Sequence, residues 1–409
     1  MGKYRRLGKN TILVFIGNLG SKLISLFMLP FYTSWLSVKD YGTVDIITVY
    51  ATFFLGIISL SIAEAVFVYP KDKDKTLQKK YFSSGLFFTF ICFILAAVIF
   101  FIAKNIFSHF NIENSFTEYA WVIYFVILVM FLQAYFQQFT RCIDKLKIYA
   151  ITGIILTVLI AFFAFLFIPS LGVMGFVYGQ ILAYLIASFF TLFFSKSYSY
   201  FSFKSINTSF YKEMIYYSVP LIPNGIMWWL VSSINRPIME AYIGIYAIGI
   251  FAVANKFPSI VAMVFTVFSN SWQISVLEEF NKKDFETYYN KILQVIFPMI
   301  VLLSCGITIF SREIVSLFAD EKFYDAWKLV PILTLAVLFS SLSGFVGTCF
   351  SAARKSKYYF YSSAFGALGS VLFNLMLIPY LGLLGAAIAM VLSHLVMALT
   401  RIKYSWQFV

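Results

Sequence analysis

The chain has 409 residues, of which 61% are hydrophobic and only 12% are charged, with a net charge of +13. Soluble globular proteins carry about 25% charged residues, so the composition excludes a soluble enzyme or binding domain. The apolar residues fall in runs of about 20, the number of helical residues that crosses a hydrocarbon core about 30 Å thick. The sequence therefore predicts an all-α polytopic membrane protein.

Twelve apolar segments are long enough to cross a membrane as helices. The basic start, MGKYRRLGKN, is typical of a signal peptide, but the apolar segment after it is too long for one and lacks a small-residue cleavage site. We therefore expect it to be retained as the first helix. The predicted spans lie near residues 11–35, 42–69, 81–103, 119–139, 149–168, 173–194, 214–235, 245–270, 289–309, 328–349, 358–378 and 383–402.

The lysines and arginines predict the orientation of these spans, because cytoplasmic loops are enriched in both. If both termini are cytoplasmic, most of the 31 Lys and Arg residues, Arg401 among them, lie on the cytoplasmic side. The few outside are Lys39, Lys104, Arg312, Lys322 and Lys328. Three more fall inside spans, namely Lys22, Arg236 and Lys256. The positive net charge thus indicates topology and attraction to anionic lipid, with no need for nucleic acid.

An internal repeat divides the chain. Residues 145–175 and 355–385 align without a gap at an offset of 210, sharing Lys-x-Lys-x-Tyr and a turn that reads IPSLGVMG in one copy and IPYLGLLG in the other. This pattern favours duplication over two chance turns. An even number of helices per half gives two six-helix bundles, 1–200 and 201–409, related by an axis along the membrane normal with a central cleft between them.

Residue types that would carry catalysis or bind a metal are sparse. The four cysteines are scattered without a CxxC pair, and neither of the two histidines, His109 and His394, has a nearby acid-nucleophile grouping. We therefore predict no metal, no cofactor and no enzymatic activity.

The stretch from Ser218 to Lys256 carries polar and cationic residues through apolar sequence. A cation at the centre of a span costs roughly 2.5–3.5 kcal/mol. Snorkelling to the surface, or pairing with Glu240 one turn on, could account for Arg236. For Lys22 and Lys256 the side chain is too short to reach the surface, so the sequence favours a water-filled cavity.

Prolines and acids complete the set of candidates. Pro30, Pro220 and Pro223 interrupt the first and seventh spans at comparable places, and they predict either hinges or static kinks. Asp45 and Glu64 lie in the second span. They are candidate ion-coupling residues or partners of Lys22, and the sequence leaves both alternatives open.

Two segments carry a resemblance to a known family. KNTILVFIGNLGSKLISLFMLPFYTSWLSVKDYGTVDI and SVPLIPNGIMWWLVSSINRPIMEAYIGIYAIGIFAVANK resemble bacterial polysaccharide and O-antigen flippases (the Wzx kind) of the multidrug/oligosaccharidyl-lipid/polysaccharide exporter superfamily. The resemblance implies a V-shaped two-bundle transporter that moves an undecaprenyl-diphosphate-linked oligosaccharide between leaflets by alternating access. Where that family commonly has an Asp-Arg pair, this chain has Asn235-Arg236.

The predicted substrate site combines cations for the diphosphate with amides for phosphate or sugar. Its residues are Lys22, Arg236, Lys256, Asn18, Asn224, Asn235 and Asn255. The expected partners are the lipid-linked oligosaccharide, the bilayer, H+ or Na+ as coupling ion and a polysaccharide polymerase, and the expected location is the bacterial inner or plasma membrane. The alternatives are a cation-coupled multidrug exporter of the same superfamily and, with less support, a membrane polymerase or glycosyltransferase.

Overall fold

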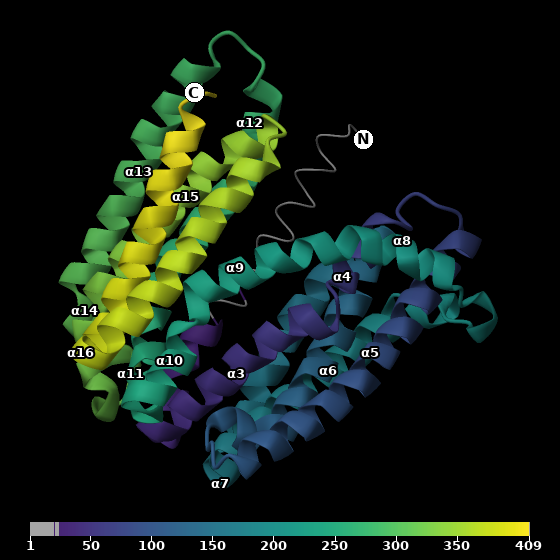
Figure 1. Ribbon diagram of the computed structural model, residues 1–409, viewed down its shortest axis with the longest axis horizontal. Coiled ribbons are helices and arrows are strands. Elements are labelled where there is room, and N and C mark those ends of the chain that lie inside the picture. Colours follow the sequence, from purple (N-terminus) through teal and green to yellow (C-terminus); the bar gives the residue numbers. More distant parts are fainter. Residues whose placement is uncertain (1–19, 21–23, 409) are drawn as a thin grey trace. The chain divides into compact units, whose positions relative to one another are not determined.

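The computed structural model describes residue 20 and residues 24–408, and these residues form helices with no strand among them (Figure 1). Eight helices in this part of the chain are long and apolar enough to cross a membrane. The prediction of an all-α polytopic membrane protein is confirmed. The described residues form two compact units, and the chain passes from the first to the second between Ile226 and Met227. Ser37–Gly42 also belongs to the second unit. The predicted bundle boundaries, twofold axis and cleft stay predictions.

The first unit packs around helix α6. Its elements are α2 (Leu29–Trp35), α3 (Val38–Ile58, from Thr43 onward), α4 (Ile62–Val68), α5 (Lys75–His109), α6 (Ser115–Cys142), α7 (Leu146–Phe194), α8 (Thr208–Ser218) and the 3-10 turns η1 (Ser197–Tyr200), η2 (Phe203–Ser205) and η3 (Val219–Leu221). Helix α6 contacts α4, α5 and α7. Its side chain Tyr135 is fully buried and donates a hydrogen bond to the carbonyl of Phe82 in α5 at 2.8 Å. This bond joins the two helices inside an aromatic core.

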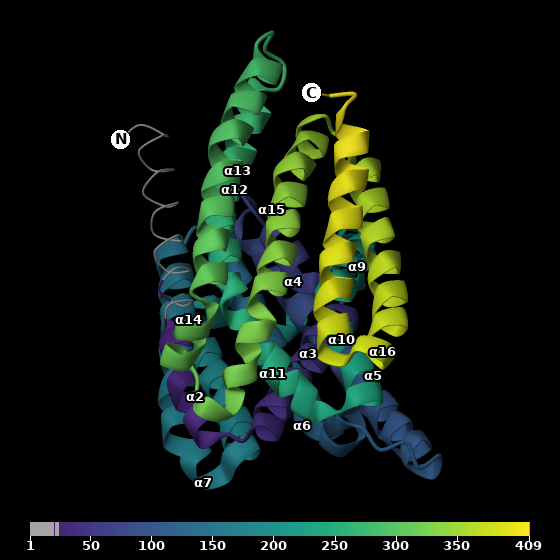
Figure 2. The ribbon, with the colours of Figure 1, turned by 90° about the vertical axis from the view of Figure 1, so that its left-hand side faces the viewer.

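The second unit packs around α15 (Figure 2). Its elements are α9 (Ile222–Ser233, from Met227 onward), α10 (Asn235–Ile243), α11 (Ile245–Lys256), α12 (Pro258–Glu279), α13 (Phe285–Ile309), α14 (Ser311–Phe318), η4 (Glu321–Lys328), α15 (Val330–Ala352) and α16 (Ser356–Ser405). Helix α15 contacts α11, α12, α13 and α16. Trp272 of α12 stacks on Phe345 of α15 with ring centroids 4.8 Å apart, and both side chains are buried.

Helices α7 and α16 each contain two predicted spans. Each runs through an internal proline and then changes direction at one glycine with positive φ, Gly172 in α7 and Gly382 in α16. The two arms of α7 lie side by side, because Thr152 and Thr191 share a hydrogen bond of 2.9 Å. In α16, Arg401 donates to Ser362 at 3.2 Å in the same way. The structure thus reproduces the repeat that the sequence predicts.

Other predicted spans are interrupted. The second span breaks between α3 and α4, where Leu60 and Ser61 have positive φ. The seventh is divided by η3, and the eighth is divided at Phe257 between α11 and α12. Breaks of this kind leave backbone groups without helical partners, and membrane proteins tolerate them only where protein or a watery cavity covers them.

Candidate functional site

Arg236 lies inside the second unit with only 5% of its surface exposed. Its Nη1 donates to the carbonyl of Ser232 at 2.8 Å and to Oδ1 of Asn235 at 2.9 Å. The guanidinium carbon lies 4.8 Å from the ring centroid of Phe251 in α11, a cation–π distance. Asn235 is also buried. Arg236 is therefore held between α10 and α11 and does not snorkel, while Glu240 lies one turn further along α10 and is half-buried.

Asn255 and Lys256 close helix α11, and both are half-buried. Pro258 begins α12 and has no N–H to donate into the preceding turn. The chain tightens there, with the amide of Ile260 bonded to the carbonyl of Phe257 at 3.0 Å. The carbonyl of Lys256 accepts from the hydroxyl of Ser259 at 2.5 Å. Lys256 thus stands at an interruption in the helix, the type of position where transporters commonly bind substrate groups.

The predicted hinge prolines all stand where helices start. Pro30 is in the first turn of α2, Pro220 is in η3, and Pro223 is in the first turn of α9. Asn224 follows on α9 and is half-buried. These positions are the ones that proline favours in helices, and hinge motion stays a prediction.

The two predicted acids lie in the first unit. Asp45 is half-buried in α3. Glu64, in α4, is exposed, and its Oε1 accepts from Nε2 of Gln138 at 2.9 Å. Oε1 of Gln138 accepts from Nη1 of Arg141 at 2.8 Å. A chain of hydrogen bonds therefore links the Glu64 carboxylate to a guanidinium on α6.

Lys22 and Asn18 lie outside the described residues. Of the other predicted substrate-binding residues, the structure brings Asn235 and Arg236 into direct contact. Asn255 and Lys256 sit together at the end of α11, and Asn224 stands on α9. The assembly of all seven into one site stays a prediction.

Sequence reasoning missed one deeply buried cation. Arg401, counted above among the cytoplasmic cations, is 0% exposed inside the second unit. It donates to the hydroxyls of Ser362 and Ser363, each at 3.2 Å, and to the carbonyl of Ser343 at 2.9 Å. Its guanidinium lies 4.2 Å from the ring of Tyr359. No sequence signal indicated this burial, because the alignment of Arg401 with Thr191 of the first copy does not show which face of the helix packs inward.

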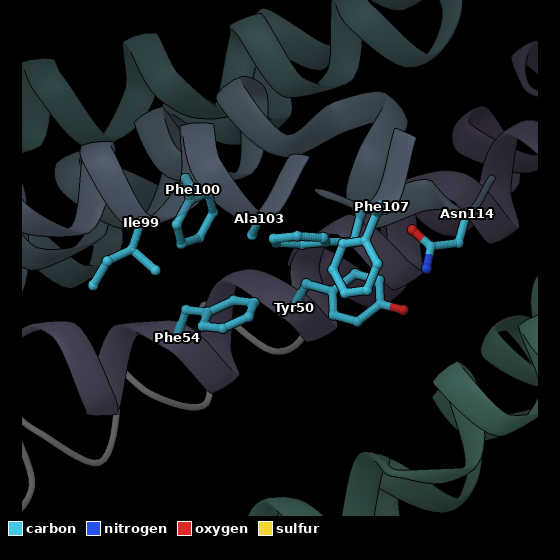
Figure 3. A pocket seen from close by; sticks show the side chains of 8 residues that line it. Tyr50, Phe54, Ile99, Phe100, Ala103, Phe107 and Asn114 are labelled. Carbon is cyan, nitrogen blue, oxygen red and sulfur yellow. The ribbon is translucent and has the colours of Figure 1, made fainter. Parts of the chain in front are cut away.

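A cavity of about 310 Å³ lies in the first unit between α3 and α5 (Figure 3). Its walls are aromatic and aliphatic, with Tyr50 and Asn114 as the polar side chains and no charged residue. The aromatic rings contact one another, as Phe54 and Phe100 do at 5.2 Å. Such a lining suits hydrocarbon and offers no cation for a phosphate. The described residues contain no group of His, Cys, Asp and Glu side chains that could hold a metal ion.

The fold and these residues define a polytopic helical membrane protein that holds basic side chains among its apolar helices. Residues 7–272 match the family model described as polysaccharide biosynthesis protein. The chain belongs to this family.

The chain is also similar to individual proteins in sequence and in structure. The chain is 24% identical to the capsular polysaccharide biosynthesis protein CapF of Staphylococcus aureus over 46% of its own length and 49% of that protein. Among solved structures, an inward-facing multidrug transporter of the MATE family and MOP superfamily superposes with a TM-score of 0.77 at 16% identity, over 96% of this chain and 97% of that one. The lipid II flippase MurJ superposes with a TM-score of 0.74 at 14% identity, over 97% of this chain and 87% of that one. The protein therefore shares its fold with these two transporters.

Proposed function

We propose that this protein is a flippase that moves an undecaprenyl-diphosphate-linked oligosaccharide, the repeat unit of an O-antigen, capsule or other surface polysaccharide, from the inner to the outer leaflet by alternating access. Membership of the polysaccharide biosynthesis family and a fold shared with a lipid II flippase support this proposal. The observation that carries it is Arg236, a guanidinium almost wholly buried among the apolar helices of the second unit. A buried cation is costly unless an anion or a hydrogen-bonded partner offsets the cost.

The chemistry of the candidate residues fits a diphosphate. Arginine offers a planar fork that matches two phosphate oxygens, while lysine offers a point charge. Arg236 and Lys256, with Lys22, would hold the diphosphate. The amides of Asn18, Asn224, Asn235 and Asn255 would donate to phosphate or sugar oxygens. Asp45 and Glu64 would couple transport to H+ or Na+.

A cation-coupled multidrug exporter is the alternative, since the fold is also that of a MATE transporter. A cavity for cationic drugs would need buried acids, however, and the buried ionisable side chains of the second unit include the basic Arg236 and Arg401. A polymerase or glycosyltransferase has weaker support, because the solved structures that share the fold are those of a transporter and a flippase. We place the flippase in the bacterial inner or plasma membrane with cytoplasmic termini, supplying a polysaccharide polymerase.

Charge-neutral replacements test the proposal in cells. Lys22→Ala and Lys256→Ala should each abolish most surface glycan while the lipid-linked precursor accumulates, as measured by gel analysis of surface glycan and by quantifying the precursor. Membrane insertion of each variant must first be verified. Lys283→Ala, at an exposed loop position, is the matched control and should export normally. Unchanged export in both test variants would show that these lysines do not hold the diphosphate.

A further inference from the structure

The two repeats have matching turns at the start of their helical hairpins. After α6 and after α15 the chain makes the same turn, with positive φ at Asp144 in the first copy and at Arg354 in the second. The amide of Lys145 bonds the carbonyl of Thr140 at 2.8 Å, and the amide of Lys355 bonds that of Phe350 at 2.9 Å. The alignment at an offset of 210 therefore identifies equivalent positions in the two units.

At one equivalent position the chemistry differs. In the first unit, Thr191 shares a buried hydrogen bond with Thr152. In the second unit, the equivalents are Arg401 and Ser362, and Arg401 donates to Ser362. Since two neutral hydroxyls suffice to join the arms of α7, the hairpin itself does not require a positive charge.

The neighbouring position makes room for the guanidinium. Gly347 of α15 is equivalent to Gln137 of α6, whose Nε2 bonds the carbonyl of Tyr149 at 2.9 Å. A side chain on Gly347 would begin 3.0 Å from Nη1 of Arg401 and 3.1 Å from the ring of Tyr359. The second unit thus has Arg401 where the first has a neutral residue, and it has Gly347 where a larger side chain would crowd the guanidinium.

Arg401 has no acidic partner among the described residues. The groups that hydrogen-bond its guanidinium are the hydroxyls of Ser362 and Ser363, the carbonyl of Ser343 and the side chain of Tyr359, and none of them is a carboxylate. The hydroxyl of Ser343 is itself buried and has no hydrogen-bond partner in the described part of the chain. Burying an ion without a counter-charge is unfavourable, because the attraction that would offset its desolvation is missing. The guanidinium and the two hydroxyls that it contacts form a cradle suited to an anion, and Ser343, which accepts from Arg401 through its carbonyl, carries a further hydroxyl that is unpartnered among the described residues.

One side of this cradle is covered by α9. The ring of Trp228 lies 5.8 Å from the guanidinium of Arg401. The carbonyl of Leu230 accepts from the hydroxyl of Ser370, at 2.8 Å, which ties α9 to α16. Helix α9 follows the 3-10 turn that contains Pro220, and prolines commonly bend helices. Exposure of Arg401 would require Trp228 to move and the bond between Leu230 and Ser370 to break.

We propose that Arg401, with Ser343, Ser362 and Ser363, is an anion site that binds the diphosphate of the lipid-linked substrate when α9 moves away. The inference rests on the proposed function, and it adds a fourth cation to the three that are proposed to hold the diphosphate. Arg401 stands one turn before the end of α16, which is the cytoplasmic end under the predicted orientation. A lipid-linked substrate that starts in the inner leaflet presents its phosphates at this depth, so Arg401 meets the diphosphate early in transport.

Binding to purified protein in nanodiscs tests this site. The probes are a polyprenyl diphosphate and the uncharged polyprenol of the same length. The test variant is Arg401→Thr combined with Gly347→Gln, which installs the residues of the first unit. Loss of a charge-assisted contact should weaken diphosphate binding by about tenfold or more and leave polyprenol binding unchanged. Arg354→Asn, which removes an exposed arginine from the same unit and suits the positive φ at this position, is the control and should bind as the wild type does.

A second variant keeps the test decisive if the double variant does not fold. Arg401→Lys keeps the charge without the fork, and its affinity for the diphosphate should lie between those of the wild type and the double variant. The proposal is contradicted if the wild type prefers the diphosphate over polyprenol and both Arg401 variants bind the diphosphate as tightly as the wild type does. If the wild type shows no preference for the diphosphate, the proposed substrate class is wrong and the inference falls with it.

Discussion

Gly172 and Gly382 have nearly the same unusual backbone conformation, with φ 55° and ψ −128° at the first and φ 57° and ψ −131° at the second. Each stands three residues after the proline of its hairpin. Non-glycine residues rarely adopt such angles. The duplicated turn therefore depends on glycine in both units, and this dependence can be tested in either one.

Replacing Gly382 by alanine should destabilise the protein through backbone strain of about 1–3 kcal/mol. A β-carbon there would meet no atom within 4 Å, so crowding adds nothing. Gly306→Ala is the matched control, because Gly306 lies within α13 without positive φ and also has open space around it. The melting temperature in detergent should fall for Gly382→Ala only. Equal melting temperatures for the two variants would refute the strain argument.

Replacing Gly249 by alanine should be more damaging. A β-carbon on Gly249 would collide with the carbonyl of Val38, and one on Gly42 would collide with the carbonyl of Ile245. The first turn of α3 thus crosses α11 backbone to backbone, a packing that only glycine permits. We expect Gly249→Ala to cost at least about 1–3 kcal/mol and to reduce the yield of folded protein, measured by size-exclusion chromatography. Gly225→Ala, with nothing within 4 Å, should behave as the wild type does.

The two acids of the first unit should differ in their effect on ion coupling. Glu64 is exposed and bonded to Gln138, whereas Asp45 is half-buried in α3. Protonation changes transport most where the charged form is sheltered from water. We therefore expect Asp45→Asn to remove the stimulation of transport by an H+ or Na+ gradient and Glu64→Gln to reduce it less. Transport rates with and without each gradient measure the effect. The reverse order would assign coupling to Glu64.

Apolar run length and the Pro-x-Leu-Gly turns were enough to predict the class of protein, most spans and the two hairpins. The break at Leu60 and Ser61 was not predictable, because no glycine or proline marks it. Nor was the burial of Arg401. Its partners lie about 40 to 60 residues away in sequence, and a nearly uniform apolar helix does not show which of its faces packs inward.

For the charged residues near α10 and α11, the sequence predicted that they matter but not what they contact. Arg236 and Lys256 were singled out because a cation within an apolar span is energetically costly. That Arg236 rests against Phe251 depends on how α10 and α11 pack, which residue spacing does not specify. The interruption at Lys256 could have been foreseen from Pro258, because proline frees the carbonyls of the preceding turn.

Transport in proteoliposomes tests the central claim most directly. Vesicles would carry a polyprenyl-diphosphate-linked saccharide in one leaflet, and its arrival in the other would be followed with a membrane-impermeant glycosidase. The wild type should move this lipid and not a cationic dye, and the double variant Arg236→Ala and Lys256→Ala should move neither. Export of the dye without movement of the lipid-linked saccharide would contradict the account and favour the drug exporter.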